Sequence, residues 1–283
     1  MGALVSVVVP VFNGLPHLRE LMSALLAQDH ADLEIVLSEG GSTDESPAFL
    51  ATIDDPRVRV IAMPPGTSAA ANWTAVTRAA TGEFVKLVCQ DDLLKPFAIS
   101  RQVESLSAER NAVMAIAQRD IVDAKGDVLY SRRGCAGLRA GVMAGTDVIR
   151  TCYLRGTNVI GEPLSVLFRR DALLEAMPWD DSNPLVLDLH MYEQVAPRGD
   201  VVVDKTSIGA FRVSTSSWST RLAGVQLHQF ERWQQQYERA QFGGISPIDQ
   251  LRAKTGVWTQ TGLRLAAYRW LAMKGSFRSA DDA

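Results

Sequence analysis

The first hundred residues alternate between short apolar runs and segments whose apolar residues recur at helical spacing. Continuous apolar runs rich in branched residues are typical of strands that are buried on both faces. Four such runs occupy residues 5–12, 33–38, 58–64 and 83–89. Helical spacing follows the first run, at Leu18, Leu21, Met22, Leu25 and Leu26, and a further helix is expected over 68–80, ending at Gly82. The alternation predicts a mainly parallel sheet with helices on both faces and ligand sites at the carboxyl ends of its strands.

Polar residues mark where the helices are expected to begin. Asn13 is expected to cap the first helix, and Ser42, Thr43 and Asp44 are candidate caps for the second. The second half of the chain is less regular. "DAKGD" at 123–127 predicts a hairpin turn between two strands, and residues 162–170 predict another strand that a short helix follows. After Ser219 the chain is rich in glutamine, arginine and aromatic residues, which favours helices.

Composition narrows the class of protein. The 283 residues are 47% hydrophobic, enough for a sizeable core and unlike a disordered or fibrous chain. The formal net charge is −3, so no overall basic field indicates a nucleic-acid partner. An anionic ligand must therefore be held by local groups.

Cysteine usage and the N-terminus indicate a compartment. The three cysteines, Cys89, Cys135 and Cys152, are widely spaced and form no C-x-x-C pair, which argues against a disulfide framework or a zinc knuckle. The apolar N-terminal stretch has no basic segment before it and is interrupted by Pro10 and Asn13, unlike a signal peptide. We expect a cytoplasmic protein.

Two adjacent carboxylates, Asp91 and Asp92, directly follow the fourth apolar run. Neighbouring negative charges at a strand end repel each other and lose solvation, so they persist most easily where a cation neutralises them. Oxygen ligands suit Mg²⁺ or Mn²⁺, which take their remaining ligands from water or a substrate diphosphate. The alternative is that both aspartates begin a solvated helix and interact favourably with its dipole.

The order of the N-terminal motifs resembles that of family 2 glycosyltransferases, which have the GT-A fold. In that family the corresponding stretches are approximately V-S-V-V-I-P-x-Y-N, V-D-D-G-S-T-D and a strand that ends in D-x-D-D. Here they are "VSVVVPVFN", "LSEGGSTD" and "VKLVCQDD", in the same order and at strand ends over about ninety residues.

The resemblance implies a set of residues that bind the donor nucleotide. Pro10, Val11, Asn13 and Asn72 would line the nucleotide pocket, and Gln90 and Asp91 would border the diphosphate. Asp91 and Asp92 would hold Mn²⁺ or Mg²⁺. Glu39 stands where the family usually has an aspartate that contacts the base or ribose, and a UDP-sugar is the favoured donor.

This chain departs from the family pattern at two positions. Gly40 replaces the second aspartate of the D-D-G-S element, and Cys89 replaces the first aspartate of D-x-D-D. Cys89 is a soft ligand that suits neither Mg²⁺ nor Mn²⁺, so we interpret it as a core residue. Donor identity is open because Glu39 is one methylene longer than aspartate.

The resemblance also implies residues for the reaction and the acceptor. Asp188 matches an aspartate that begins a helix beyond the sheet and acts as the general base, although an ordinary first-turn aspartate would have the same sequence context. Glu162 and Trp218 are expected to contact the acceptor. Arg212 would pair with a phosphate, with a surface strand position as the alternative.

The C-terminal tail combines basic and aromatic residues. Residues 252–278 carry six basic side chains, no acidic one, and four interleaved aromatics. Such a composition fits peripheral attachment to the inner face of an anionic membrane. Packing on the catalytic domain or a homodimer contact fits it equally well.

These inferences predict an inverting, metal-dependent glycosyltransferase with a mixed, mostly parallel sheet. Its acceptor would be a hydroxyl of a glycan or lipid-linked saccharide, as in cell-surface polysaccharide biosynthesis. Residues 1–218 would form the catalytic domain, with a nucleotide-sugar half at 1–95 and an acceptor half at 96–218, and 219–283 a helical extension. The alternative is a catalytically silent protein that binds a nucleotide or glycan. An oxidoreductase lacks support, because neither G-x-G-x-x-G nor a P-loop motif occurs.

Overall fold

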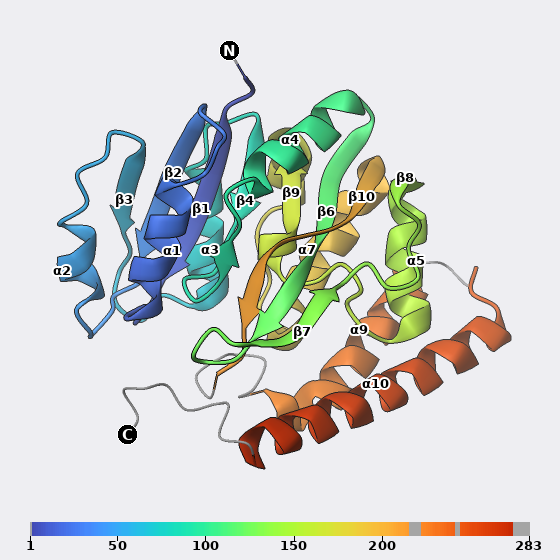
Figure 1. The fold of residues 1–283 in the computed structure, drawn as a ribbon. Coiled ribbons are helices and arrows are strands. Elements are labelled where there is room, and N and C mark those ends of the chain that lie inside the picture. The colour runs from blue at the N-terminus through green and yellow to red at the C-terminus, as the bar shows by residue number, and fades with distance from the viewer. Residues whose placement is uncertain (1, 215–221, 241–243, 274–283) are drawn as a thin grey trace.

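The computed structural model describes residues 2–214, 222–240 and 244–273, and Figure 1 gives the order of their elements. The strands are β1 (Val5–Val11), β2 (Leu33–Glu39), β3 (Val58–Ala62), β4 (Phe84–Leu87), β5 (Leu93–Leu94), β6 (Ala112–Val122), β7 (Val128–Arg133), β8 (Gly141–Ala144), β9 (Val166–Arg169) and β10 (Asp200–Arg212). The α-helices are α1 (His17–Leu26), α2 (Ser46–Leu50), α3 (Ala69–Arg78), α4 (Ala98–Ala108), α5 (Gly145–Arg155), α6 (Arg170–Ala176), α7 (Leu187–Val195), α9 (Gln226–Ala240) and α10 (Pro247–Met273).

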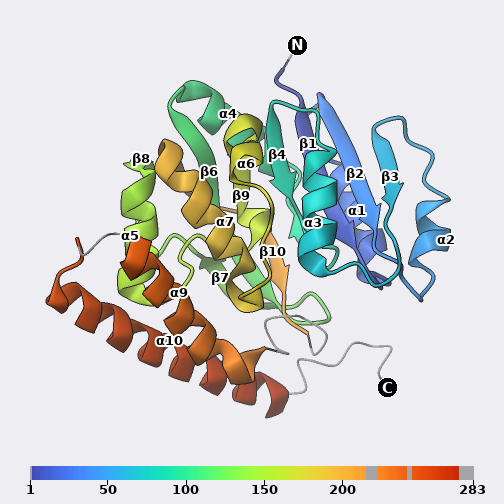
Figure 2. The same ribbon diagram turned by 180° about the vertical axis from the view of Figure 1, so that it is seen from behind.

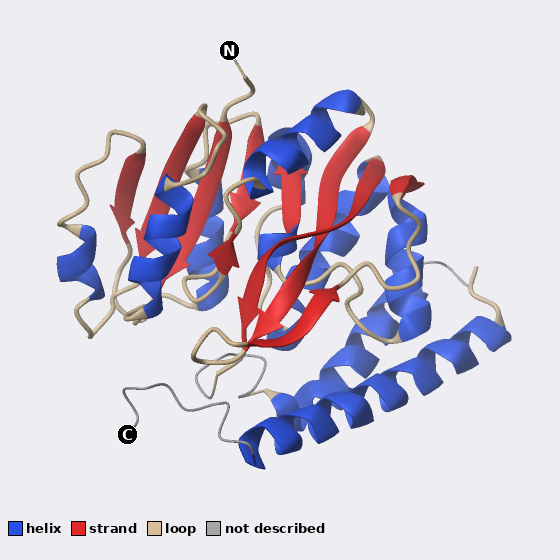
Figure 3. Ribbon diagram, in the orientation of Figure 1, coloured by secondary structure: helices blue, strands red, loops and turns tan. Residues whose placement is uncertain are grey.

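The strands form one central sheet in the order β3-β2-β1-β4-β9-β6-β10-β5, with β7 on β6 and β8 on β10 (Figure 3). Strands β3, β2, β1 and β4 are parallel to one another. Strand β9 is antiparallel to both of its neighbours, while β10 is parallel to β6. The sheet is therefore parallel in the N-terminal half of the chain and mixed beyond it.

Helices cover both faces of the sheet because its strands are apolar on both sides. Every residue of β1 is buried. Val5, Val7, Val9 and Val11 face α1 and α4, while Val8 faces the opposite layer. That second layer contains α3, α6, α7 and α9 (Figure 2). The continuous apolar run thus became a central strand, as the pattern predicted.

The C-terminal helices share the core of the sheet. Phe230, Trp233 and Tyr237 of α9 and Ala253 and Val257 of α10 belong to the same buried cluster as the sheet residues Val8 and Ile116. Helix α10 also contacts α5 closely, since a Cβ atom on Gly156 would lie 2.1 Å from the backbone nitrogen of Val257.

Two expected caps are wrong in detail. Asn13 does not cap α1, because three residues separate it from the helix and the N-cap Pro16 makes no side-chain hydrogen bond. Helix α2 starts after Glu45, whose side chain does not cap it, although Asp44 Oδ1 accepts a hydrogen bond from the Ser46 nitrogen at 2.9 Å.

Two expected element boundaries are also corrected. The strand expected from residue 162 begins at Val166, because Pro163–Ser165 form a 3₁₀ turn (η1). Asp91 and Asp92 do not begin a helix, since they precede the short strand β5 and α4 begins only at Ala98. The expected hairpin is confirmed, with β6 and β7 antiparallel around residues 123–127.

Within the described parts of the chain, no helix has both the length and the apolar character needed to cross a bilayer.

Candidate active site

The loop after β1 is held by Gln90, which lies between β4 and β5. Gln90 Oε1 accepts a hydrogen bond from the Phe12 nitrogen, and Gln90 Nε2 donates one to the Phe12 oxygen, both at 2.8 Å. A Cβ atom on Gly14 would lie 2.8 Å from the same amide, so glycine leaves room for it. The sequence placed Gln90 at the donor, and the structure joins it to the first strand's loop.

The same loop packs against the loop after β2. The Asn13 nitrogen donates to Ser42 Oγ at 2.9 Å, and Asn13 Oδ1 accepts from the Thr43 nitrogen at 2.8 Å. The Leu15 nitrogen donates to Asp44 Oδ2 at 3.2 Å. Asn13 has a φ of 50°, a left-handed conformation that asparagine tolerates better than most residues. The polar side chains expected as helix caps therefore shape the surface between two strand ends.

Glu39, at the end of β2, organises its own loop. Its carboxylate accepts hydrogen bonds from the nitrogens of Gly41 at 3.1 Å and Ser42 at 2.6 Å. Position 40 has no space for a side chain, because a Cβ atom there would lie 2.8 Å from the Val11 oxygen and 2.9 Å from Asn72 Nδ2. The departure at Gly40 is thus explained by close packing of β1, β2 and α3.

Asn72 joins α3 to this group. Its Nδ2 donates to the Val11 oxygen at 3.3 Å, while its buried Oδ1 completes no hydrogen bond within the described residues. Pro10 is buried in β1 and pairs with Ser38 of β2. Five of the residues expected at the donor, Val11, Asn13, Glu39, Asn72 and Gln90, therefore surround two adjoining loops.

Asp92 is the least satisfied charged group of the region. It is 1% exposed, and neither of its carboxylate oxygens completes a hydrogen bond with a described residue. Burial and the negative charges of Asp91 and Glu162 raise its pKa well above the usual range. Burial also raises the pKa of Asp91, and the positive charge of Arg212 offsets part of this rise. A buried carboxylate without partners is costly unless a cation or a proton neutralises it.

Asp188 lies in the first turn of α7 and faces the same region from the acceptor half. Its Oδ2 accepts a hydrogen bond from Asn158 Nδ2 at 2.9 Å. Asn158 is itself fixed, because its Oδ1 accepts from the nitrogens of Ile160 and Gly161 at 3.0 and 3.1 Å. Burial, with the negative charge of Glu162, raises the pKa of Asp188 to about 7.

Glu162 forms an ion pair with Arg119 of β6, with 2.5 Å between Oε2 and Nε. The side chain of Arg119 is 9% exposed and that of Glu162 is 27% exposed. Gly161 has a φ of 110°, and a Cβ atom there would lie 3.0 Å from the Arg119 guanidinium carbon. Glycine at this position therefore lets the arginine reach Glu162.

The carboxylates converge on one place. The charges of Asp92, Asp91, Asp188 and Glu162 all act on the Cys89 thiol, and together with burial they raise its pKa. Cys89 is partly buried and packs against the core cluster. Asp91 and Asp92 come from the donor half and Glu162 and Asp188 from the acceptor half, so the two halves meet at Cys89.

Arg212, at the end of β10, is buried rather than on the surface. Its Nε donates to the backbone oxygen of Asp91 at 3.1 Å, and its Nη1 donates to the backbone oxygen of Ala124 at 3.2 Å. Its Nη2 donates to Glu20 Oε2 of α1 at 2.6 Å. The arginine thus fixes the backbone of the aspartate pair. Trp218, expected at the acceptor, lies outside the described residues.

Sequence reasoning missed three polar residues that support the site: Arg119, Asn158 and Lys86. Lys86 is fully buried in β4, and its Nζ donates to Gln102 Oε1 and to the Leu164 oxygen, both at 2.6 Å. It therefore holds the η1 turn that follows Glu162. A single charge within an otherwise apolar strand was the available signal for Lys86. Arg119 lies between Gln118 and Asp120 in β6, so it did not stand out in this way. Asn158 lies in a loop and gave no such signal.

The residues present fit a hard cation only in part. Asp91 and Asp92 offer oxygen ligands, and the Asp92 carboxylate has no partner in the described part of the chain. Among the described residues, however, no group of three or more histidine, cysteine, aspartate or glutamate side chains is arranged to hold a metal. A divalent ion here would need further oxygens from a ligand or from water, as Mg²⁺ commonly does.

Comparison with known proteins identifies relatives of this chain. The sequence profile described as Glycosyl transferase family 2 matches residues 6–174. The succinoglycan biosynthesis protein ExoO of Rhizobium meliloti is 30% identical over 122 residues, which cover 43% of this chain and 35% of ExoO. The matched segment thus spans about a third of that relative.

Solved structures share the fold. S. aureus TarS 1–349 in complex with UDP-GlcNAc superposes with a TM-score of 0.64 at 13% identity, covering 90% of this chain and 71% of that one. The mannosyltransferase PcManGT from Pyrobaculum calidifontis, in complex with GDP-Man and Mn²⁺, superposes with a TM-score of 0.59 at 16% identity. The match covers 96% of this chain and 81% of the PcManGT chain. The fold is GT-A, as the sequence predicted.

Proposed function

Because the chain belongs to glycosyl transferase family 2, we propose that it transfers a sugar from a nucleotide diphosphate to a hydroxyl group, with inversion at the anomeric carbon. The observation that carries the proposal is the aspartate pair after β4, where Asp92 is buried and neither of its carboxylate oxygens has a partner among the described residues. The acceptor is a glycan or a lipid-linked saccharide, and the match to a succinoglycan biosynthesis protein supports a role in polysaccharide synthesis.

The donor half binds the nucleotide. Val11, Asn13 and Asn72 line its pocket with Pro10 beneath, and Glu39 contacts the base or ribose. The Asn72 Oδ1 accepts no hydrogen bond from a described residue, which supports a role as an acceptor for a ligand group. A UDP-sugar is the favoured donor, since TarS binds UDP-GlcNAc, although PcManGT shows that the fold also accepts GDP-Man.

Asp91, Asp92 and Gln90 border the diphosphate, and the two aspartates would hold Mn²⁺ or Mg²⁺. The Mn²⁺ in PcManGT and the unpartnered Asp92 support such an ion. When bound, the cation supplies positive charge to the leaving diphosphate. Arg212 positions Asp91, and it contacts a phosphate directly only when Glu20 releases it.

Asp188 is the general base. Its carboxylate takes the proton of the acceptor hydroxyl while that oxygen bonds to the anomeric carbon and the bond from this carbon to the diphosphate breaks. A base with a pKa of about 7 is well matched to this task near neutral pH. Asn158 orients the carboxylate, and Glu162 and Trp218 contact the acceptor sugar.

Donor binding is tested by thermal unfolding with UDP, GDP, dTDP and CMP, each with and without Mn²⁺. A ligand at about a hundred times its Kd stabilises the native state by about 2.7 kcal/mol, so one nucleotide should raise the Tm. Asp92→Asn should lose the Mn²⁺-dependent part of that rise. A metal-dependent rise that persists in Asp92→Asn would overturn the assignment of the metal ligands.

Catalysis is tested with Asp188→Asn, which should lower kcat by about 10²- to 10⁴-fold and leave nucleotide binding unchanged. A wild-type kcat would refute the base assignment, and a silent binding protein would show no transfer in either form.

The same variant carries its own control for folding. The folded-state pKa of Asp188 is raised from 3.8 to about 7, so its ionised form destabilises the fold as pH rises through this range. Asp188→Asn should therefore keep or raise the Tm at about pH 8, and the gain should disappear below pH 3.8.

A further inference from the structure

Among the residues that the structure describes, helix α10 is held to the rest of the molecule along one side. Its inner side buries Ala253, Val257, Thr261 and Leu271. Its backbone approaches α5 so closely that a Cβ atom on Gly256 would lie 2.8 Å from the Arg155 carbonyl carbon. The helix is therefore a fixed part of the fold, and its outer side is a defined surface.

The outer side is unusually apolar for a surface exposed to water. Six large apolar residues are exposed along it: Ile248 (72%), Leu251 (64%), Trp258 (65%), Leu263 (61%), Trp270 (42%) and Met273 (79%). A helix of 27 residues is about 40 Å long, so these side chains form an extended strip rather than one small patch. A strip of this size indicates an interaction surface.

The charges on the same helix have one sign on the outer side. Arg252, Lys254 and Arg269 are exposed. Arg264 turns inward, where its Nη1 donates to Gln226 Oε1 at 3.2 Å and its Nη2 to Thr157 Oγ1 at 3.1 Å. The one acidic residue of the helix, Asp249, pairs with Arg150 of α5 at 2.6 Å. The exposed strip is therefore apolar and cationic.

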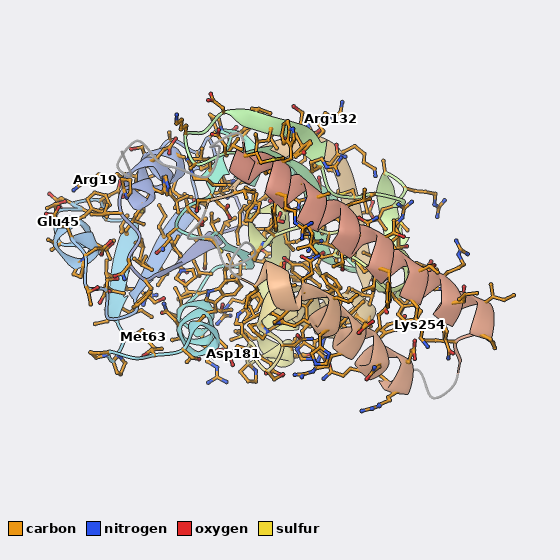
Figure 4. The ribbon with its side chains drawn as sticks, turned by 90° about the horizontal axis from the view of Figure 1, so that it is seen from below. Arg19, Glu45, Met63, Arg132, Asp181 and Lys254 are labelled. Atoms are coloured by element: carbon orange, nitrogen blue, oxygen red, sulfur yellow. The ribbon has the colours of Figure 1, made fainter. Side chains whose placement is uncertain are left out.

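The strip lies on the same side of the molecule as the active site. The carboxyl ends of β1, β2 and β3 point downward in Figure 1, and α10 lies along the lower edge. Figure 4, seen from below, shows α10 crossing the acceptor half of this face. The contacts agree, since Tyr268 and Leu271 pack with Val213, the residue after Arg212.

We propose that this strip docks on an anionic lipid bilayer, with α10 lying in the plane of the membrane interface. Apolar side chains and tryptophans enter the interface, while lysine and arginine meet anionic headgroups. A second copy of the chain fits less well, because two such strips would bring Arg252, Lys254 and Arg269 of each copy together without a carboxylate between them.

Docking in this orientation turns the carboxyl ends of the strands toward the lipid. An acceptor sugar carried on a lipid would then be presented to Asp188 without leaving the membrane. This last step rests on the proposed function, whereas docking itself does not.

Co-sedimentation of the full chain with vesicles tests the proposal. We expect binding to vesicles that contain phosphatidylglycerol and much weaker binding to phosphatidylcholine alone. Arg252→Gln/Lys254→Gln/Arg269→Gln should weaken the binding about a hundredfold, since each basic residue near an anionic surface contributes about a fivefold step. Trp258→Ser/Trp270→Ser should also abolish most of it. Both variants change residues that are exposed on α10, and thermal unfolding of each variant checks that it folds as the wild type does.

Matched controls lie far from α10. Val60→Ser/Phe97→Ser removes exposed apolar side chains from β3 and the start of α4, and Arg59→Gln/Arg78→Gln/Arg110→Gln removes the same net charge elsewhere. Both should bind vesicles as the wild type does. Absence of binding by the wild type, or equal binding by all variants, would overturn the proposal.

The alternative occupant has its own readout. If light scattering shows a dimer that Trp258→Ser/Trp270→Ser converts to a monomer, and no vesicle binding occurs, a second copy covers the strip and the lipid proposal is wrong. The UDP and Mn²⁺ thermal shift, measured without vesicles, reports on the proposed function separately. Loss of that shift with vesicle binding intact would refute the donor site and leave the docking surface standing.

Discussion

Asp188 and Glu162 show how neighbouring carboxylates set the chemistry of a residue. Asp188 is held by Asn158, yet burial and the charge of Glu162 keep its pKa near 7. Glu162 also forms an ion pair with Arg119. The charges of Glu162 and Arg119 therefore both contribute to the pKa of Asp188.

This arrangement predicts the pH dependence of Glu162→Gln. Removing the negative charge of Glu162, and freeing the positive charge of Arg119, should both lower the pKa of Asp188. In the wild type, kcat should rise with pH as Asp188 loses its proton. In Glu162→Gln this rise should occur at lower pH. Kinetics between about pH 5 and 9 would measure the shift.

Glu83→Gln provides the matched control, because Glu83 pairs with Arg169 at a surface position. Its profile should overlay that of the wild type. A rise at the wild-type pH in Glu162→Gln would mean that Glu162 does not act on the base.

At the scale of elements, the contact of α10 with α5 requires a glycine at position 256. A Cβ atom on Gly256 would meet the Arg155 carbonyl, whereas one on Gly262, six residues along the same helix, would meet nothing within 4 Å. Alanine substitutions at these two positions therefore distinguish the effect of helix propensity on stability from the effect of packing.

We expect Gly262→Ala to stabilise the protein by about 0.5–1 kcal/mol, since alanine favours a helix interior over glycine. Gly256→Ala has the same gain in propensity but forces α10 away from α5, so it should destabilise the fold by about 1–3 kcal/mol. Chemical denaturation of both variants measures the difference. Equal stabilisation by both alanines would show that α10 is not packed on α5.

The elements that the sequence predicted best are those with long periodic signals. The buried strand at residues 5–12 and the hairpin at 123–127 were found because periodicity and turn chemistry are local. The start of β9 was misplaced because Leu164 and Ser165 are compatible with a strand, and only the packing of η1 over Lys86 shows the turn.

The candidate site was predictable only where a motif exists. Asp91, Asp92, Asp188 and Glu162 were named from sequence, and the structure brings them together. Arg119 and Asn158 act through contacts between segments far apart in the chain, which no local pattern records. Arg212 was named for a phosphate, but its protein partners come from a helix, a hairpin and the aspartate loop.

At the scale of the whole molecule, the C-terminal helices and the sheet share one core. Trp233 of α9 is completely buried, and its Nε1 donates to Glu193 Oε2 of α7 at 2.8 Å. The boundary expected at residue 218 therefore does not separate two cores among the described residues. Such a molecule should unfold as one cooperative unit.

Calorimetry of Trp233→Ala tests this expectation. Truncating a buried tryptophan costs about 3–5 kcal/mol, so the whole transition should move down by roughly 10 °C while remaining single. Trp258→Ala, which changes an exposed tryptophan of α10, should leave the transition within about 2 °C. Two separate transitions, with only one of them shifted, would instead describe an independent C-terminal domain.

The position of β10 has a consequence for how the protein is made. Strand β5, directly after the aspartate pair, is antiparallel to β10, and Arg212 reaches the Asp91 carbonyl across 121 residues of chain. During synthesis the first four strands emerge early and can fold as a unit. The carboxylates beside them gain their support only after the ribosome has completed β10. We therefore expect a nascent chain to pass through a stage in which the nucleotide half is folded but inactive.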